Sequence, residues 1–451
     1  MKATEVIGIL PRVPNIPRGA QLLPIVWFEI YLAATVALYA WGPWPWPTKN
    51  APQLYFFLFL AHVALLAGYL SAVRGTPRGK SHTRALRILV TAGAVIGLLM
   101  FVPTFLQRTG GAVSIPDMLD NLFADAGIRY NETRLATMLY QKSSVVEYIR
   151  VLLSPITWPL FPLTVVFWKW LSVTLRSAAM AAIIGNLLVH LAIGTNKGIA
   201  DAIILLPCFI LVRRFHERHY PNVRDRFQVV ILFVLGMSLF IPFFGMNIAG
   251  RYGMVSTPDF DFQAKIGVDN EHPLLRYLPE ALQDGTRSLS AYITEGYYGL
   301  SLALDKPFVP CYGWGNSYFL IGLLEHYQGR YTALRRTYPG RIEDEGWAAD
   351  LKWDTIYPWI ASDVGFPGTI LVVFLIGRLL ALAWIDSIGA GNLLAVVLLS
   401  HLIIMISYFP CNNQVLQNAE TWPTFWVTLG LWLWDRRKRS EEVERKVSRT
   451  S

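Results

Sequence analysis

Residues 227–248 read FQVVILFVLGMSLFIPFFGMNI and contain no charged side chain. As an α-helix, a stretch of this length would be about 33 Å long, enough to cross the hydrocarbon core of a bilayer. Arginines stand on both sides of it, with Arg224 and Arg226 before the stretch and Arg251 after it. The stretch therefore predicts a transmembrane helix.

Similar apolar stretches recur along the chain and predict about ten transmembrane helices. Hydrophobic residues make up 53% of the 451 residues and charged residues only 16%, whereas about 25% of the residues in soluble domains are charged. The predicted fold is an all-α polytopic membrane protein. The expected spans are residues 22–41, 53–73, 88–106, 151–168, 177–194, 198–213, 227–248, 366–385, 393–409 and 419–434.

The positive charges predict the orientation of these spans. They gather in segments 74–87 and 213–226 and in the tail that follows Trp434. Short loops rich in Lys and Arg stay in the cytoplasm, so we expect all three segments there, together with both termini. The formal net charge of +9 then reflects membrane topology, with the lipid bilayer as the partner and no binding to nucleic acid.

Two loops on the expected outer face are long. Loop 107–150 ends in a predicted amphipathic helix from Glu132 to Arg150. Loop 249–365 contains apolar segments at 289–304 and 317–324, which are too short to cross a bilayer. We expect them to form re-entrant or interfacial helices that line a cavity.

These features divide the chain into four parts. We expect an N-terminal transmembrane bundle at 1–248, a large outer loop at 249–365, C-terminal transmembrane helices at 366–434 and a basic cytoplasmic tail at 435–451.

The large outer loop is dense in charged and aromatic residues. Guanidinium groups suit phosphate oxygens, and carboxylates beside aromatic faces suit sugars, but an ordinary solvated surface would have the same composition. Cys311 in this loop and Cys411 are expected on the same side of the membrane, where they either form a disulfide or remain free thiols. No Cys or His spacing indicates a metal site.

Three segments around this loop contain short motifs. They are residues 192–198, AIGTNKG, residues 315–319, GNSYF, and residues 354–368, DTIYPWIASDVGFPG. The first resembles the Thr-x-Arg/Lys-Gly step of the O-antigen polymerase (Wzy-type) family, and the second resembles its Gly-x-Ser-aromatic stretch. The third is similar to the segment that re-enters the membrane in that family. Outside 192–368, only the hydropathy profile matches.

The resemblance implies a GT-C-like, metal-independent glycosyltransferase of the bacterial inner membrane, without a cofactor. Such an enzyme joins oligosaccharide repeat units carried on undecaprenyl diphosphate at the periplasmic face, with lipid-linked glycans as both donor and acceptor and with a possible chain-length regulator as partner.

The chemistry of such an enzyme suggests candidate residues. Cations must stabilise the departing diphosphate, a base must accept the proton of the acceptor hydroxyl, and aromatic rings can stack on sugars. Each of these residue types also has a structural explanation. Lys197 would extend its ammonium group to the membrane surface, the arginines would lie on the protein surface, and Asp363 would cap a helix. The diphosphate candidates are Lys197, Arg251, Arg330, Arg335 and Arg336; the base candidates are Asp363, His326, Glu345, Glu295 and Asp350; the sugar-binding candidates are Tyr297, Tyr298, Trp314 and Tyr318.

Two other functions remain open. An O-antigen ligase would share this architecture but transfer the glycan to a lipid core. A flippase or transporter for lipid-linked sugars could use ionisable residues inside the membrane, but we expect most of those residues to form hydrogen bonds between helices. They are Glu29, His62, His190, Asp201 and His401.

Overall fold

The protein is almost entirely helical in the part of the chain that the structure describes. The structure, a computed structural model, describes residues 16–79, 82–109, 145–218, 221–249, 256–257, 259–328, 332–349 and 351–450. Its only β-strands within these ranges form a three-stranded antiparallel sheet of two-residue strands, in the order β1-β2-β3. Ser256 pairs with Asp261, and Asp261 pairs in turn with Ile266. The strands are β1 (Ser256–Thr257), β2 (Phe260–Asp261) and β3 (Ile266–Gly267).

Seven helical stretches among the described residues are long and apolar enough to cross a membrane, which supports a multi-pass membrane protein. They are α1 (Arg18–Trp41), α2 (Ala51–Leu70), α3 (Thr83–Thr109), α6 (Val145–Thr157) together with α7 (Leu160–Val166), α8 (Val173–Ala192), α10 (Val223–Ala249) and α15 (Ile356–Ala390).

The other three predicted spans also fall in helices. They correspond to α9 (Lys197–Arg218), α16 (Leu393–Ser407) and the first half of α18 (Thr421–Thr450). The apolar helix α16 has only 15 residues, fewer than the roughly 20 that a bilayer requires. The count of ten spans therefore remains a prediction.

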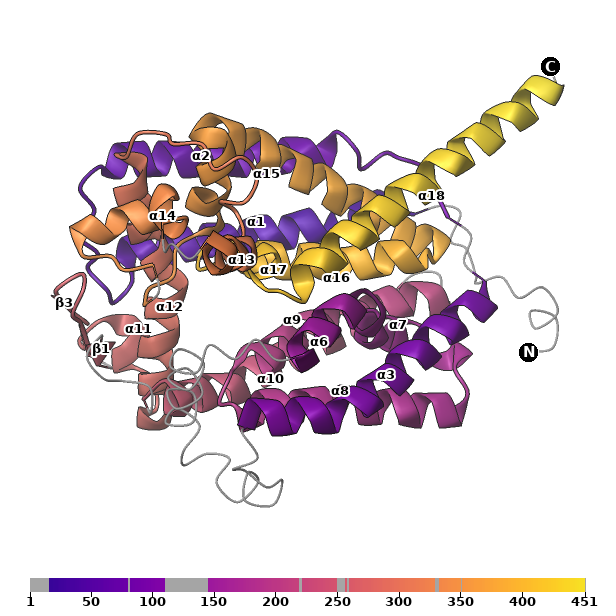
Figure 1. Ribbon diagram of the computed structural model, residues 1–451, viewed down its shortest axis with the longest axis horizontal. Coiled ribbons are helices and arrows are strands. Elements are labelled where there is room, and N and C mark those ends of the chain that lie inside the picture. The colour runs from indigo at the N-terminus through magenta and orange to yellow at the C-terminus, as the bar shows by residue number, and fades with distance from the viewer. Residues whose placement is uncertain are drawn as a thin grey trace.

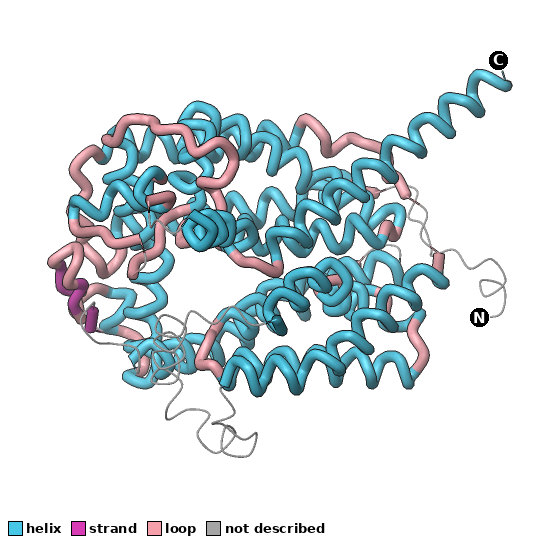
Figure 2. Tube along the Cα trace, in the orientation of Figure 1, coloured by secondary structure: helices cyan, strands magenta, loops and turns pink. Residues whose placement is uncertain are grey.

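The long helices form two groups (Figures 1 and 2). The first contains α1, α2, α15, α16 and α18, and the second contains α3 and α6–α10. Helix α12 (Glu280–Leu304) lies at one end of the molecule and packs against both α10 and α1. The two groups and α12 thus surround the space in which the main cavity lies.

Local sequence determines where two of the long helices begin or bend. At the start of α10, the Asp225 backbone N–H donates to Asn222 Oδ1 at 2.8 Å, and the Asn222 N–H donates to Asp225 Oδ2 at 3.2 Å. This reciprocal capping satisfies backbone donors that a helix start leaves free. Helix α15 bends at Gly365, where φ is 70°. A residue without a Cβ adopts this conformation readily.

Close backbone contacts join α2 to α15. A Cβ atom on Gly68 would overlap the carbonyl oxygen of Phe374, and one on Gly377 would overlap that of Leu65. Small residues allow membrane helices to approach in this way. The position of α15, and hence of the segment that precedes it, depends on this contact.

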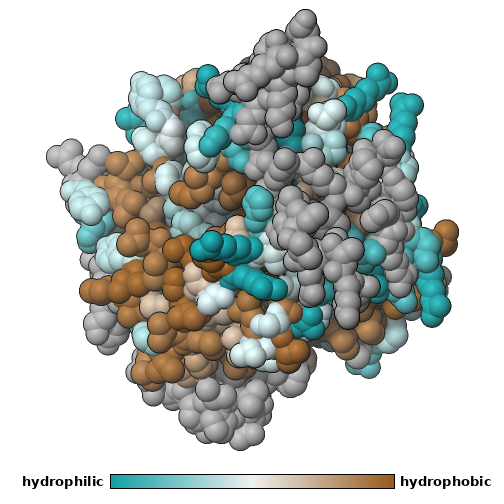
Figure 3. Space-filling view, turned by 90° about the vertical axis from the view of Figure 1, so that its right-hand side faces the viewer, coloured by the Kyte–Doolittle hydropathy of each residue, from teal (hydrophilic) through white to brown (hydrophobic). Residues whose placement is uncertain are grey.

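Much of the helical surface is apolar. In each of α1, α3, α8 and α10, only 22% of the most hydrophobic 18-residue stretch is buried. Large residues such as Leu99 (70% exposed) and Leu239 (67% exposed) face outward. Figure 3 shows a broad hydrophobic area on one side of the molecule. Such surfaces are expected where helices face lipid.

The three basic segments lie at the same end of the helix bundle. Asp386 near the end of α15 accepts hydrogen bonds from the Arg78 N–H at 2.8 Å and from Arg436 at 2.7 Å. Trp384 lies two residues before Asp386 on α15. Its ring contacts that of Phe215, which belongs to the basic segment 213–226, at a centroid distance of 6.0 Å. This arrangement agrees with their predicted location on one side of the membrane.

The predicted outer loop packs at the opposite end and contains several short helices. The apolar segment 289–304 belongs to the 25-residue helix α12, and segment 317–324 belongs to α13. Most of the helix predicted from Glu132 to Arg150 lies outside the described residues. The short elements of the loop are α11 (Pro273–Arg276), α13 (Tyr318–Gln328), α14 (Tyr338–Arg341) and the 3₁₀ turns Leu334–Arg336 and Ile342–Glu345. Two further short elements, α17 (Gln414–Gln417) and the 3₁₀ turn Trp168–Trp170, lie outside the loop.

Candidate active site

A cavity of about 1250 Å³ lies between α1, α9, α10 and α12. Most of its wall is apolar, because α1, α9 and α10 contribute Leu, Ile, Val, Phe and Trp side chains, among them Trp27, Ile204 and Phe233. Its polar part is lined by the outer-loop residues Glu295 and Lys352 and by Lys197 at the start of α9. The cavity therefore joins a long apolar surface to a charged end.

A buried ion cluster forms one side of the charged end. Lys352 Nζ donates to Glu295 Oε2 at 3.2 Å and also to Asp261 Oδ2. The three residues are only 7%, 6% and 3% exposed, respectively. Burial of these charges is tolerable because each has an oppositely charged partner.

Three separate elements bring this cluster together. Asp261 lies on β2, and its Oδ1 accepts the backbone N–H groups of Gln263 and Ala264, both at 3.0 Å. This turn leaves Oδ2 directed at Lys352, which lies in the segment before α15. Glu295 comes from the middle of α12.

The environment changes the acidity of the buried groups. Burial raises the pKa of Glu295 to about 7, although the charge of Lys352 opposes the increase. Burial also raises the pKa of Asp354, which is 1% exposed, well above its usual value, and the charge of Glu295 adds to this effect. For Lys352, burial lowers the pKa, but Glu295 and Asp261 outweigh it and the net pKa is raised. Glu295 can thus exchange a proton near neutral pH while Lys352 stays charged.

Lys197 lies at the first residue of α9, with its side chain 24% exposed. Its Nζ donates to Asp201 Oδ2 at 2.6 Å, and an ammonium group has three donors, so two remain for other acceptors. The neighbouring Asn196 is 8% exposed and lines the same cavity, and neither polar atom of its side chain has a hydrogen-bond partner in the structure. Both side chains are available to a polar ligand in the cavity.

Aromatic rings also line the charged end. Tyr292 and Trp353 lie with ring centroids 6.2 Å apart, and Tyr318 and Trp359 lie 6.1 Å apart. All four residues line the cavity. Tyr318 is the sugar-binding candidate that the structure places here.

The other aromatic candidates are packed elsewhere. Tyr297 is 2% exposed and its hydroxyl is 2.8 Å from Thr35 Oγ1. Tyr298 is 8% exposed, with Trp347 at a ring-centroid distance of 5.1 Å. Trp314 packs on a separate small hydrophobic cluster. Packing inside the protein accounts for these three side chains.

Asp363 holds a turn of the outer loop. Its Oδ1 accepts the N–H groups of Gly313 and Gly315 at 2.7 and 3.0 Å, and its Oδ2 accepts the backbone and side-chain N–H groups of Asn316 at 2.9 and 2.6 Å. The two oxygens of a carboxylate have about four acceptor sites, so these four donors leave none for a substrate hydroxyl. Geometry favours a structural role for Asp363.

The remaining candidates lie outside the cavity or outside the described residues. Glu345 forms ion pairs with Lys49 at 2.9 Å and Lys306 at 2.8 Å, which lower its pKa. His326 and Arg335 are exposed, as is Arg336, which donates to the Pro310 carbonyl at 3.3 Å. Arg251, Arg330 and Asp350 fall outside the described residues.

One pair of the membrane histidines and acids forms the expected hydrogen bond between helices. Glu29 and His62 form a hydrogen bond of 2.7 Å between α1 and α2, and the His401 ring stacks on Trp158 at 4.9 Å. In contrast, His190 and Asp201 face a second cavity together. Cys311 and Cys411 are both buried and free.

Sequence reasoning missed Lys352 and Asp261. They are separated by 91 residues, and no local motif indicates their pairing. The only signal is that both belong to the same large loop as Glu295.

Comparison with known protein families, curated proteins and solved structures finds no match to this chain.

Proposed function

We propose that this chain is a membrane glycosyltransferase that polymerises oligosaccharide repeat units linked to undecaprenyl diphosphate, at the periplasmic face of the bacterial inner membrane. One observation carries the proposal: a single large cavity combines an apolar wall with a charged, aromatic end that contains Lys197 and Glu295. This combination suits a molecule with a long hydrocarbon chain, a diphosphate and sugars.

The polyprenyl chain would lie along the apolar side chains of α1, α9 and α10. The most hydrophobic stretches of α1 and α10 are only 22% buried, so a lipid-linked substrate could enter beside them from the membrane. The sugars would then lie near Tyr292, Tyr318 and the two tryptophans, whose faces provide stacking surfaces at the charged end of the cavity.

The reaction would proceed by displacement at the anomeric carbon of the donor. The acceptor hydroxyl oxygen forms the new bond to that carbon, its proton passes to the Glu295 carboxylate, and the bond to the diphosphate oxygen breaks. The undecaprenyl diphosphate leaves with the electron pair, and Lys197 offsets its negative charge. Lys352 holds Glu295 in place and stabilises its ionised form.

Removal of Lys197 tests this function. In the native host, Lys197→Ala should leave single repeat units on the surface lipid, whereas Lys197→Arg should retain part of the polymer because the positive charge remains. Lys169→Ala is a matched control, since Lys169 is 60% exposed and pairs with Glu217 at the opposite end of the bundle. Gel profiles of the surface glycan would report chain length.

The same experiment separates the alternatives. A ligase defect would leave full-length polymer on undecaprenyl diphosphate and none on the lipid core. A flippase defect would leave no repeat units on the outer face. Polymer of normal length in Lys197→Ala cells would refute the proposed role of Lys197.

A further inference from the structure

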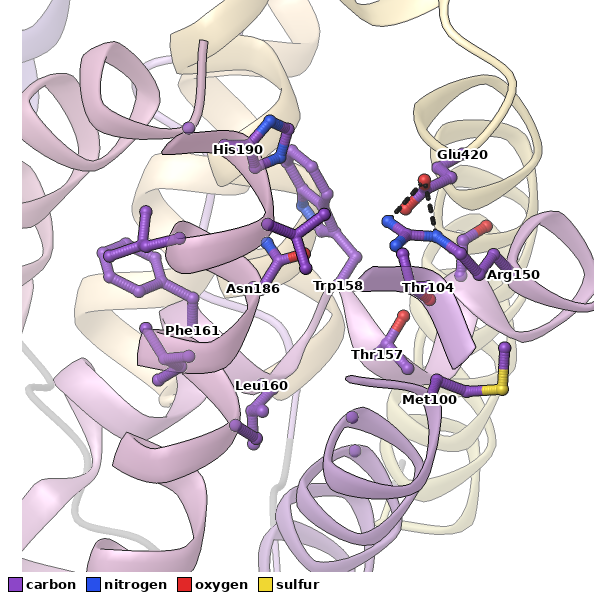
Figure 4. A pocket seen from close by; sticks show the side chains of 18 of the residues that line it. Met100, Thr104, Arg150, Thr157, Trp158, Leu160, Phe161, Asn186, His190 and Glu420 are labelled. Carbon is purple, nitrogen blue, oxygen red and sulfur yellow. Dashed lines mark hydrogen bonds and ion pairs between the residues drawn. The ribbon is translucent and has the colours of Figure 1, made fainter. Parts of the chain in front are cut away.

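A second cavity, of about 360 Å³, lies between α3, α6, α8 and α9 and is closed on one side by residues 418–421. Figure 4 shows Asn186 and Trp158 on one side of it and Arg150, Thr104 and Thr157 on the other. Lys197 and Asn418 line both this cavity and the large one. The two cavities are therefore neighbours that share the side chain proposed to hold diphosphate.

Each of four helices directs a pair of polar residues into this second cavity. The members of each pair are four positions apart, and residues at that spacing lie on the same face of a helix. Polar side chains within membrane helices are costly and usually serve a function. The pairs are Thr104 and Arg108 on α3, Arg150 and Ser154 on α6, Asn186 and His190 on α8, and Lys197 and Asp201 on α9.

The charges of the cavity are balanced. Arg108 pairs with Glu147 at 2.8 Å, and Arg150 pairs with Glu420 at 2.7 Å, as the dashed lines of Figure 4 show for the second pair. The third cation, Lys197, pairs with Asp201. An anion in this cavity would meet the carboxylate partner of every cation, although Lys197 keeps further donors for a ligand in the large cavity. The cavity instead offers donors and acceptors side by side.

Two buried oxygen atoms in the wall have no hydrogen-bond partner among the residues that the structure describes. They are Thr104 Oγ1, in a residue 1% exposed, and Asp201 Oδ1, in a residue 8% exposed. Buried polar atoms normally have partners. A ligand with hydroxyl groups would satisfy both.

An aromatic ring completes the wall. The indole N–H of Trp158 donates to Ser400 Oγ at 2.9 Å, which fixes the ring, and Lys197 Nζ lies 6.0 Å from the ring centroid. His401 covers one face of this ring at a centroid distance of 4.9 Å. The paired donors and acceptors around the ring match the hydroxyl groups at the edge of a sugar.

We infer that this second cavity binds a neutral sugar residue. Its volume falls within the range of small-ligand sites, about 300–1000 Å³. That this sugar belongs to the lipid-linked substrate rests on the proposed function, and Lys197 would then lie between the sugar and the diphosphate. The binding of a sugar itself does not depend on polymerase activity.

Sugar binding can be measured on the full-length protein in lipid nanodiscs by saturation-transfer NMR. The probes are the methyl glycosides of glucose, galactose, mannose, rhamnose and N-acetylglucosamine. Thr104→Val removes one hydroxyl at constant shape, and Asn186→Leu removes an amide. Each should weaken binding of the best probe by about threefold to tenfold, the effect of one lost hydrogen bond.

Thr164→Val is the matched control. Thr164 is also fully buried with an unpartnered hydroxyl, but it does not line the cavity. Binding should be unchanged in this variant. Thermal unfolding of all three variants would show that they are folded.

Two results would overturn the inference: no saturation transfer from any glycoside to the wild-type protein, or equal binding in Thr104→Val and Thr164→Val. Failure here, combined with loss of polymer in Lys197→Ala cells, would leave the proposed function intact. Normal polymer in Lys197→Ala cells, combined with glycoside binding to the purified protein, would reject the proposed polymerase function but not the binding of a sugar.

Discussion

Lys352 and Glu295 are joined by a hydrogen bond of 3.2 Å although 57 residues separate them. Glu295 lies in the middle of α12, and Lys352 lies in the segment that leads into α15. Both side chains are almost completely buried, and both line the large cavity. The bond therefore fixes a carboxylate of raised pKa at the charged end of the cavity.

This relationship predicts the pH dependence of glycan transfer. A general base must be ionised, and burial raises the pKa of Glu295 to about 7, so the transfer rate should rise as pH increases through about 7. In Glu295→Gln the rate should fall by about 10²–10⁴-fold and lose this dependence. The measurement is transfer of purified lipid-linked repeat units as a function of pH.

Lys352→Met extends this test to the partner residue. The Lys352 charge lowers the pKa of Glu295, so its removal should raise that pKa and move the pH profile to higher pH. A purely structural role for Lys352 would reduce the rate without moving the profile. An unchanged profile in both Lys352→Met and Glu295→Gln would exclude Glu295 as the base.

The helices were predictable because their signal is local. Apolar stretches such as 227–248 mark a helix by composition alone, and the Arg clusters mark one end of the bundle. The kink in α15 was harder to predict, since the helix begins at Ile356 and continues through Gly365, whereas hydropathy places the span at 366–385. A helix that begins outside the bilayer and then enters it has no single hydropathy boundary.

The site was less predictable, because it depends on contacts between distant segments. Lys197 and Glu295 are candidates from the sequence and line one cavity, whereas the base candidate Asp363 does not line it. Only the fold shows the four donors that surround Asp363. The i and i+4 pairs on α8 and α9 were visible in the sequence, but their convergence on one cavity was not.

The cysteines should behave as isolated, protected thiols. Cys311 is 0% exposed and Cys411 is 3% exposed, and burial raises the pKa of Cys311 to about 11. In a Cys208→Ala variant, a maleimide should label neither residue in the native protein and both after denaturation without reductant. Mass spectrometry would count the labels. Two labels that appear only after reduction would indicate a disulfide.

The contact between α2 and α15 should tolerate no side chain at its glycines. In Gly377→Ala, the new methyl group would overlap the Leu65 carbonyl oxygen, so the two helices must move apart, at a cost of about 1–3 kcal/mol. Thermal unfolding in detergent should show a lower midpoint. Gly430→Ala is the control, because nothing lies within 4 Å of a Cβ at that position in α18. Equal midpoints for both variants would contradict this packing.

The ion pair between Asp386 and Arg436 should hold α18 against α15. Asp386 is completely buried and also accepts the Trp432 indole N–H at 3.1 Å. In Asp386→Ala, Arg436 loses its carboxylate partner, although its side chain is only 12% exposed. Leaving a buried charge without its partner costs about 3–5 kcal/mol. Asp386→Asn should cost less, since its amide oxygen can still accept one of these hydrogen bonds. Unfolding midpoints in detergent would rank the variants, with Asp344→Ala, an exposed acid of the outer loop, as the control. If Asp386→Ala unfolds at the same temperature as Asp344→Ala, the pair does not hold the two helices together, and the hydrophobic contacts between α16 and α18 must do so instead.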